Sequence, residues 1–292
     1  MANTINWGKI YESTAWGNTD NSISWGKSYA DLAGGGGFTG LLDTYSGAAA
    51  AYSLRQLSST YSGDAIVVRR ASDNTTQSIG FVNNELDTAT LESFCSGTDG
   101  FVTTWYDQSG NGNDVAEATA AYQPKIVSAG STITDGGKPS IFVDQGDTLG
   151  LSIPISSAST QDFFQVHKTN DDRFILLKDN DSGARYAYAV IDANTSTGLH
   201  GSYGSPSLYV NGSAQSPSNR DDLHTLLCTN TQILMSSIGG DSSAWTGDVV
   251  WGYYSGTNVY NGNVQEIIFY NSDQSANRTG IESNINTHYS IY

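Results

Sequence analysis

The second half of the chain is a succession of short β-prone runs separated by turn residues, and this pattern restricts the fold more than any other feature. The runs lie at residues 140–143, 149–155, 162–167, 173–178, 184–191, 207–210, 223–229, 231–235, 249–254 and 264–270. Many short strands with regular turn signals are typical of sandwiches and barrels. The sequence therefore predicts an all-β fold, a β-sandwich of the jelly-roll type.

Local signals place one hairpin and three helices. Residues 208–210 are followed by Asn211-Gly212, a pair that favours a type I′ hairpin turn because both positions tolerate positive φ. Helix propensity predicts a short helix over residues 48–57. A second helix is expected over residues 86–94, with Asp87 or Thr88 as its N-cap. The tail, residues 272–289, has Ile281, Ile285 and Tyr289 four apart, which predicts an amphipathic helix packed on the sheet.

One stretch concentrates polar chemistry, and it reads FVTTWYDQSGNGND over residues 101–114. Its first half has the β-branched and aromatic composition of a strand. Its second half predicts a tight loop, because its residues tolerate positive φ or bond their own backbone. Asp107, Asn111, Asn113 and Asp114 offer oxygens that could ligate Ca²⁺, but Asx-rich turns commonly bond their own backbone. Structural corner, calcium site and ligand contact all remain open.

Charge narrows the range of partners. The chain has 29 acidic and 13 basic residues and a formal net charge of −16, which disfavours nucleic acid and anionic membranes. Carbohydrate, divalent cation and protein partners remain open. No stretch approaches the roughly 20 apolar residues of a membrane helix. Cys95 and Cys228 could pair or could remain thiols.

The first thirty residues contain a Trp-Gly repeat. Trp7, Trp16 and Trp25 lie nine residues apart, each followed by glycine, and Tyr11 and Tyr29 follow the outer copies. Short repeats need neighbours to cover their apolar faces, so we expect residues 1–33 to be an arm for assembly or attachment. The alternative is a strand pair folded back on its own domain. Residues 34–40 form a glycine-rich linker, and residues 41–292 form the sandwich.

Several strings resemble the start of the catalytic domain of family 54 α-L-arabinofuranosidases. They are Tyr61-Ser62-Gly63, residues 68–73, Phe94-Cys95 and residues 106–113, with a weaker match at residues 238–241. The resemblance implies a concanavalin-like two-sheet sandwich, and it gives Asp241 the place of the general acid/base.

The chain departs from that family at the other catalytic carboxylate. A retaining glycosidase needs two carboxylates about 5 Å apart. The family's nucleophile lies in an Asp-x-Glu-Asn string between these two motifs, and no such string occurs here. Glu117 is the only glutamate between Trp105 and Asp241. The family's adjacent Cys-Cys is also missing.

The chain also resembles the lectin-like or laminin-G-like domains of bacteriophage virion proteins. The residues concerned are the sandwich start, the hairpin at 208–212, the ending at 278–287 and the N-terminus at 3–11. The N-terminus lacks the basic and apolar regions of a secretory signal, so we expect no Sec export. Release by lysis would account for a virion protein made in the host cytoplasm.

Aromatic residues late in the chain offer a possible sugar platform. Trp245, Trp251, Tyr253 and Tyr254 could present aromatic faces to a glycan, although half-buried aromatics are nearly as frequent in ordinary cores.

The sequence therefore favours a non-catalytic phage virion protein displayed on the particle surface, as capsid decoration or as tail fibre. Its expected partners are other virion proteins through the arm, sister subunits, most plausibly in a trimer, and a host glycan. No cofactor is expected, apart from the open question of Ca²⁺. The alternative is a glycoside hydrolase of arabinofuranosidase type acting on polysaccharide, with Asp241 catalytic. A pure lectin is a third hypothesis.

Overall fold

The computed structural model describes residues 37–144, 151–169, 173–179, 181, 185–251, 253–255 and 258–292. The chain divides between Thr39 and Gly40, and the unit Gly40–Tyr292 holds the described helices and strands. The predicted arm, with Trp7, Tyr11, Trp16, Trp25 and Tyr29, lies outside the described residues.

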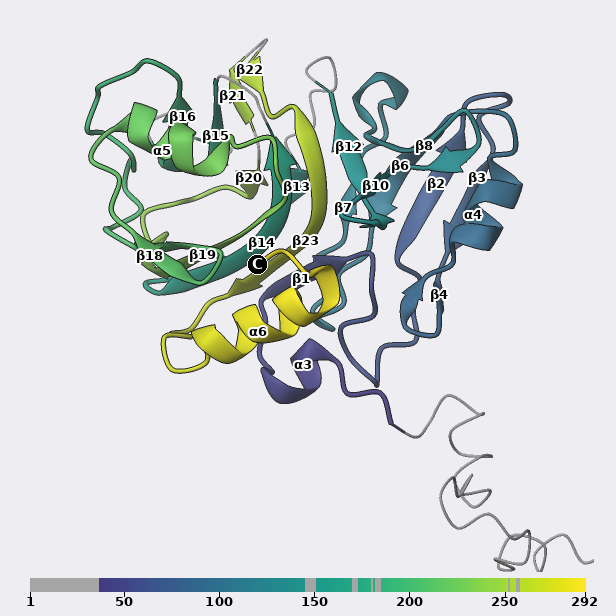
Figure 1. The fold of residues 1–292 in the computed structure, drawn as a ribbon, viewed down its shortest axis with the longest axis horizontal. Helices are drawn as coiled ribbons and strands as arrows, with labels where there is room; N and C mark the ends of the chain where they lie inside the picture. The colour runs from purple at the N-terminus through teal and green to yellow at the C-terminus, as the bar shows by residue number, and fades with distance from the viewer. Residues whose placement is uncertain are drawn as a thin grey trace, which may run out of the picture. The chain divides into compact units, whose positions relative to one another are not determined.

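A large, curved sheet forms the body of this unit (Figure 1). Its strand order is β18 (Ser213–Gln215), β17 (Ser207–Val210), β19 (Ile233–Gly240), β14 (Gln161–Thr169), β23 (Gly262–Tyr270), β12 (Ile141–Val143), β8 (Lys125–Ser128), β6 (Gly100–Trp105), β2 (Ile66–Arg70) and β3 (Thr76–Ile79). Three more strands pair beside this path, namely β1 (Ala50–Ser53) on β23, β7 (Val115–Ala116) on β6 and β9 (Ser131–Thr132) on β8.

A second sheet has the order β13 (Leu151–Ile153), β20 (Val249–Trp251), β15 (Arg173–Asp179) and β16 (Tyr186–Ile191). It contributes to one apolar core together with the large sheet, as Tyr188 of β16 shows by its edge-on contact with Phe163 of β14. The described remainder includes three short ribbons, β4 (Phe81–Val82) with β5 (Glu85–Leu86), β10 (Thr134–Asp135) with β11 (Lys138–Pro139), and β21 (Tyr253–Ser255) with β22 (Asn258–Val259).

The opposite face of the large sheet is covered by α6 (Arg278–Tyr289), as Figure 1 shows. Ile281, Ile285 and Tyr289 of this helix pack into a second apolar cluster with Ala51 and Ile268. Strands β14 and β23 are buried along nearly their whole length because both of their faces are covered. The other described helices are α3 (Leu41–Thr44), α4 (Thr88–Phe94), α5 (Arg220–Leu227) and the 3-10 turn η2 (Ala120–Tyr122).

The all-β prediction is confirmed as a sheet-rich sandwich with few helices. The hairpin is confirmed, with φ of 51° at Asn211 and 75° at Gly212. The C-terminal helix is confirmed, and so is α4, whose N-cap Asp87 accepts the Thr90 N–H.

Two element predictions are wrong. The alanine-rich residues 48–57 are not helical, because residues 50–53 pair with β23, where small side chains fit between the sheet and α6. Residues 223–229 are not a strand, because α5 runs to Leu227, with Leu223 and Leu227 buried four residues apart. Among the described helices, none is long and apolar enough to cross a membrane.

Candidate functional site

The loop after β6 is organised by the buried carboxylate of Asp107. One oxygen accepts the Ala51 N–H at 2.8 Å and the Ser109 N–H at 2.8 Å. The other accepts the Ser109 hydroxyl at 2.7 Å and the Asn113 N–H at 3.1 Å. A carboxylate offers about four acceptor positions, so the backbone and Ser109 occupy them all.

The other three side chains of the predicted calcium set also bind protein groups. The Asn111 amide donates to Ala48 O at 2.9 Å, and the Asn113 amide donates to Ala49 O at 2.8 Å. Asp114 accepts the Asp107 N–H at 2.9 Å. The polar groups of this stretch thus bind other parts of the chain and tie the loop after β6 to β1 and to the residues just before it, while the calcium site stays a prediction.

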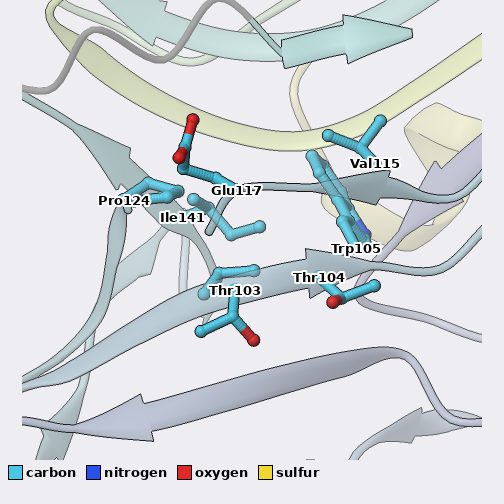
Figure 2. Close-up of a pocket in the computed structure, with 8 residues that line it drawn as sticks. Thr103, Thr104, Trp105, Val115, Glu117, Pro124 and Ile141 are labelled. Carbon is cyan, nitrogen blue, oxygen red and sulfur yellow. The ribbon is translucent and has the colours of Figure 1, made fainter. Parts of the chain in front are cut away.

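Trp105 lines a small cavity next to this loop (Figure 2). Its volume is about 10 Å³, with Val115, Glu117 and Ile141 among its lining residues. The Trp105 Nε1 atom is buried and has no hydrogen-bond partner among the described residues. A volume of this size holds about one water molecule, so the cavity cannot accept a sugar.

Asp241 begins the turn that follows β19. Its N–H donates to Tyr203 O at 3.0 Å, and the next N–H, from Ser242, donates to Ala158 O at 2.8 Å. The Ser243 N–H donates to the Asp241 carboxylate at 2.9 Å. Hydrogen bonds from the Ser243 hydroxyl and N–H lower the pKa of Asp241 below its usual 3.8, so its carboxylate is ionised at neutral pH.

Two buried side chains fix this turn from behind. Tyr203 packs so closely on Gly240 that a Cβ there would lie 2.4 Å from the ring. Asp162 of β14 accepts the Gly239 N–H at 2.6 Å and the Gln274 N–H at 2.7 Å. Burial raises the pKa of Asp162 above 3.8. Because Asp162 is completely buried and both of its oxygens are occupied, it positions the turn and does not contact substrate.

The strand order of the sheet does not place Glu117 next to Asp241. Glu117 follows β7 next to β6, whereas Asp241 follows β19, and strands β14, β23, β12 and β8 lie between β6 and β19 in the sheet. Five strand spacings of about 4.8 Å each separate β6 from β19, which is roughly 24 Å along the curved sheet, whereas the carboxylates of a glycosidase pair lie about 5–10 Å apart.

The proposed aromatic platform is largely interior. Trp251 is fully buried, and its indole donates to Gln165 Oε1 at 2.8 Å. Trp245 is 3 % exposed, donates to Ser202 O at 2.8 Å and packs on Tyr203. Neither ring presents a free face to a sugar. Tyr253 and Tyr254 belong to β21, and their side chains lie outside the described part of the chain.

One group of metal-ligating side chains occurs in the described residues, and the sequence did not suggest it. Ligand atoms of Asp192, Asp221 and His224 lie within 4.8 Å of one another between the end of β16 and α5. The Asp192 side chain is 55 % exposed, and Asp221 already accepts the Ala193 N–H at 2.8 Å. These three residues could contact a divalent cation. However, Asp192 is exposed to solvent and Asp221 already accepts a hydrogen bond, so neither carboxylate needs a cation to be satisfied. Cys95 and Cys228 do not form a disulfide.

Two solved structures of arabinofuranosidases share the fold of this chain. A GH54 α-L-arabinofuranosidase soaked with a cyclic sulfate inhibitor superposes with a TM-score of 0.55 at 15 % identity, over 85 % of this chain and 65 % of that one. An arabinofuranosidase complexed with arabinofuranosyl-α-1,2-xylobiose superposes with a TM-score of 0.50 at 17 % identity, over 85 % and 64 %. At this identity the likeness establishes the fold alone.

Comparison of the sequence with known proteins identifies the family of the chain. The family model "Alpha-L-arabinofuranosidase B, catalytic" matches residues 43–272, and the chain belongs to this family. Alpha-L-arabinofuranosidase B of Emericella nidulans is 34 % identical over 111 residues, which cover 34 % of this chain and 22 % of that protein. A probable α-L-arabinofuranosidase B of Aspergillus flavus is 32 % identical over the same shares. The chain therefore spans about a fifth of the length of these relatives.

This family membership corrects the main hypothesis from the sequence. The phage virion assignment, the virion location and the non-enzymatic reading are wrong, because the match covers a catalytic domain and includes Asp241. The family model extends over residues 43–272, which make up most of the sandwich. The partners of the predicted arm stay a prediction, because the arm lies outside the described residues.

Proposed function

We propose that this chain is a glycoside hydrolase domain that removes α-L-arabinofuranosyl groups from a polysaccharide. The observation that carries the proposal is the family match over residues 43–272. Within this range, the turn that begins at Asp241 is fixed by Tyr203, Ala158 and Asp162. The finer description of the fold as a concanavalin-like jelly roll belongs to the same proposal.

Asp241 is the general acid/base of this proposal. It is a partly exposed carboxylate on a turn whose backbone is held at three points, so its position is fixed while its oxygens remain accessible. A positioned acid protonates the leaving-group oxygen and contributes typically 10²–10⁴-fold to the rate. The Ser243 hydrogen bonds hold its pKa low, so protonated Asp241 becomes scarcer with each pH unit above that range. We therefore expect an acidic pH optimum.

The decisive experiment compares leaving groups. A nitrophenolate leaves without protonation, whereas a sugar alkoxide needs the acid. Asp241→Asn is therefore expected to lose at least about 100-fold in kcat/KM on an arabinofuranosyl oligosaccharide. Its loss on 4-nitrophenyl α-L-arabinofuranoside should be much smaller. Equal losses on both substrates, or no loss, would rule out the acid role, and a wild-type chain inactive on both would refute the proposal.

A matched control is available on the same surface. Asp273 is an exposed aspartate whose carboxylate accepts the Ser275 N–H at 2.8 Å, in the same Asp-x-Ser turn as Asp241. Asp273→Asn should retain wild-type activity on both substrates. In addition, Ser243→Ala removes a hydroxyl that stabilises ionised Asp241, so it should move the alkaline limb of the pH profile to higher pH.

A further inference from the structure

An open pocket is lined by residues at the end of α3, by Arg55 and by one face of α6. Figure 1 shows where these two helices lie. The volume of the pocket is about 510 Å³, which is within the range of small-ligand sites. Tyr45, Arg55, Ser283, Asn284 and His288 are among its lining residues, and no lining residue is acidic. That absence is notable in a chain with 29 acidic residues and a net charge of −16.

Arg55 forms the inner part of this pocket and is 9 % exposed. Its Nε and Nη2 atoms donate to the two oxygens of Glu266 at 2.8 and 3.0 Å, and Nη1 donates to Asn284 at 2.9 Å. A guanidinium has five N–H groups, so two N–H groups on the terminal nitrogens have no acceptor among the described residues. Buried donors of this kind usually find a partner.

Neutral donors surround Arg55. Asn284 uses its amide oxygen to accept from Arg55, and its NH₂ group has no described acceptor. Ser283 adds an exposed hydroxyl. Burial, with Arg55 close by, lowers the pKa of His288 to about 4, so the imidazole is neutral at pH 7. The pocket therefore has a surplus of donors, and a ligand that fills it must bring acceptors.

We propose that this pocket binds the carboxylate of an acidic sugar unit, with Arg55 and Asn284 as the donors. A carboxylate matches the planar guanidinium and accepts two N–H bonds at once. The remaining volume accommodates a sugar ring with its hydroxyls near Ser283. The sugar part rests on the proposed action on polysaccharide, whereas the carboxylate part follows from the pocket alone.

The groups that face His288 predict a pH response. Arg55 and Lys138 are positive, Glu266 and Glu85 are negative, and the His288 Nδ1 atom lies 3.5 Å from Glu85. An added carboxylate would stabilise the protonated imidazole, so the pKa of His288 should rise above about 4 in the complex, and the affinity should rise as the pH falls toward 4.

The test is calorimetric titration of the full chain with D-glucuronate, with D-glucose as its neutral match and with acetate and inorganic phosphate as sugar-free anions. We expect binding of glucuronate only, together with a shift of the His288 proton signals in NMR spectra. Equal binding of glucose would refute recognition of the carboxylate. Equal binding of acetate or phosphate would refute the sugar part, and no binding of any probe would refute the site.

Two variants separate the pocket from general charge effects. Ser283→Glu places a negative charge on the pocket wall and should weaken glucuronate binding at least about tenfold. Ser131→Glu adds the same charge to an exposed position of β9, an element that contributes no lining residue, and should leave the affinity within about twofold. Equal effects of the two variants would overturn the assignment. Glucuronate binding by a chain that lacks hydrolase activity would refute the proposed function while leaving the site intact.

Discussion

Single side chains hold this domain's most distinctive loop in place. Asp107 accepts four hydrogen bonds, and one of them, from Ala51, crosses to β1. The sequence revealed the cluster of polar residues but could not show what they bind, because Ala48, Ala49 and Ala51 lie more than fifty positions earlier. A calcium loop and a self-bonded corner use the same residue types.

The corner can be tested at Asp107. Asp107→Asn replaces one acceptor oxygen by an NH₂ group that faces N–H and O–H donors, so it should lower the free energy of unfolding by roughly 2–3 kcal/mol. Urea unfolding measures this loss. Asp114→Asn affects one described hydrogen bond and should cost about 1 kcal/mol. Added Ca²⁺ should leave the melting temperature of the wild type unchanged, and a clear rise would support the calcium hypothesis.

At the scale of elements, the turn before Asp241 depends on a close approach. Tyr203 is fully buried, and its ring occupies the space in which a Cβ of residue 240 would lie. Gly240→Ala should therefore destabilise the domain by about 1–3 kcal/mol and should displace Asp241, lowering activity as well as stability.

Thermal unfolding and the assay on an arabinofuranosyl oligosaccharide, which needs the acid, together measure these two effects. Gly198→Ala is a suitable control, because the nearest atoms to its added Cβ lie at 3.6 Å or beyond, and it should change stability by less than about 0.5 kcal/mol. If Gly240→Ala were as stable and as active as this control, Tyr203 would not constrain the turn.

Signals from neighbouring residues were sufficient to predict some secondary-structure elements but not others. The Asn211-Gly212 turn and the Asp87 cap are determined by neighbouring residues, and both are confirmed. The alanine run at 48–57 has high helix propensity, but its pairing partner lies more than 200 residues away. Pairing at that distance leaves no local signal, so the sequence could not predict that β1 overrides helix propensity.

The turn at Asp241 and the pocket around Arg55 also differ in whether the sequence alone could reveal them. Asp241 could be found from the sequence because Gly239-Gly240-Asp241 is contiguous and resembles a family motif. The pocket around Arg55 could not be found from the sequence. Arg55 comes close to Ser283, Asn284 and His288 only after β1 has paired with β23 and α6 has packed on these strands. The predicted trimer stays a prediction.

At the scale of the whole molecule, three histidines link stability to pH. Burial lowers the pKa of His167, His200 and His288 from 6.5 to about 4. The unfolded chain therefore binds protons at a pH where the folded chain does not. The free energy of unfolding should be highest above pH 6.5 and should fall as the pH drops from about 6.5 toward 4.

Each pKa unit corresponds to about 1.4 kcal/mol, so the total loss should reach several kcal/mol. Urea unfolding at a series of pH values from 7 to 5 measures it. The His200 Nδ1 atom accepts the Tyr188 N–H at 3.3 Å, and His200→Gln can keep an acceptor there without titrating. That variant should show a shallower pH dependence than the wild type, and a flat wild-type profile would contradict the prediction.

Strand β23 has a consequence for how the domain is made. It pairs with β1, β12 and β14, yet it comprises residues 262–270 and follows all three in the chain. Until the ribosome has synthesised β23, these three strands lack that central partner, and the edges that β23 will occupy are unpaired, although β12 can already pair with β8 and β14 with β19. The sandwich can close only after β23 emerges, so we expect late, slow folding and a nascent chain that depends on protection from aggregation until then.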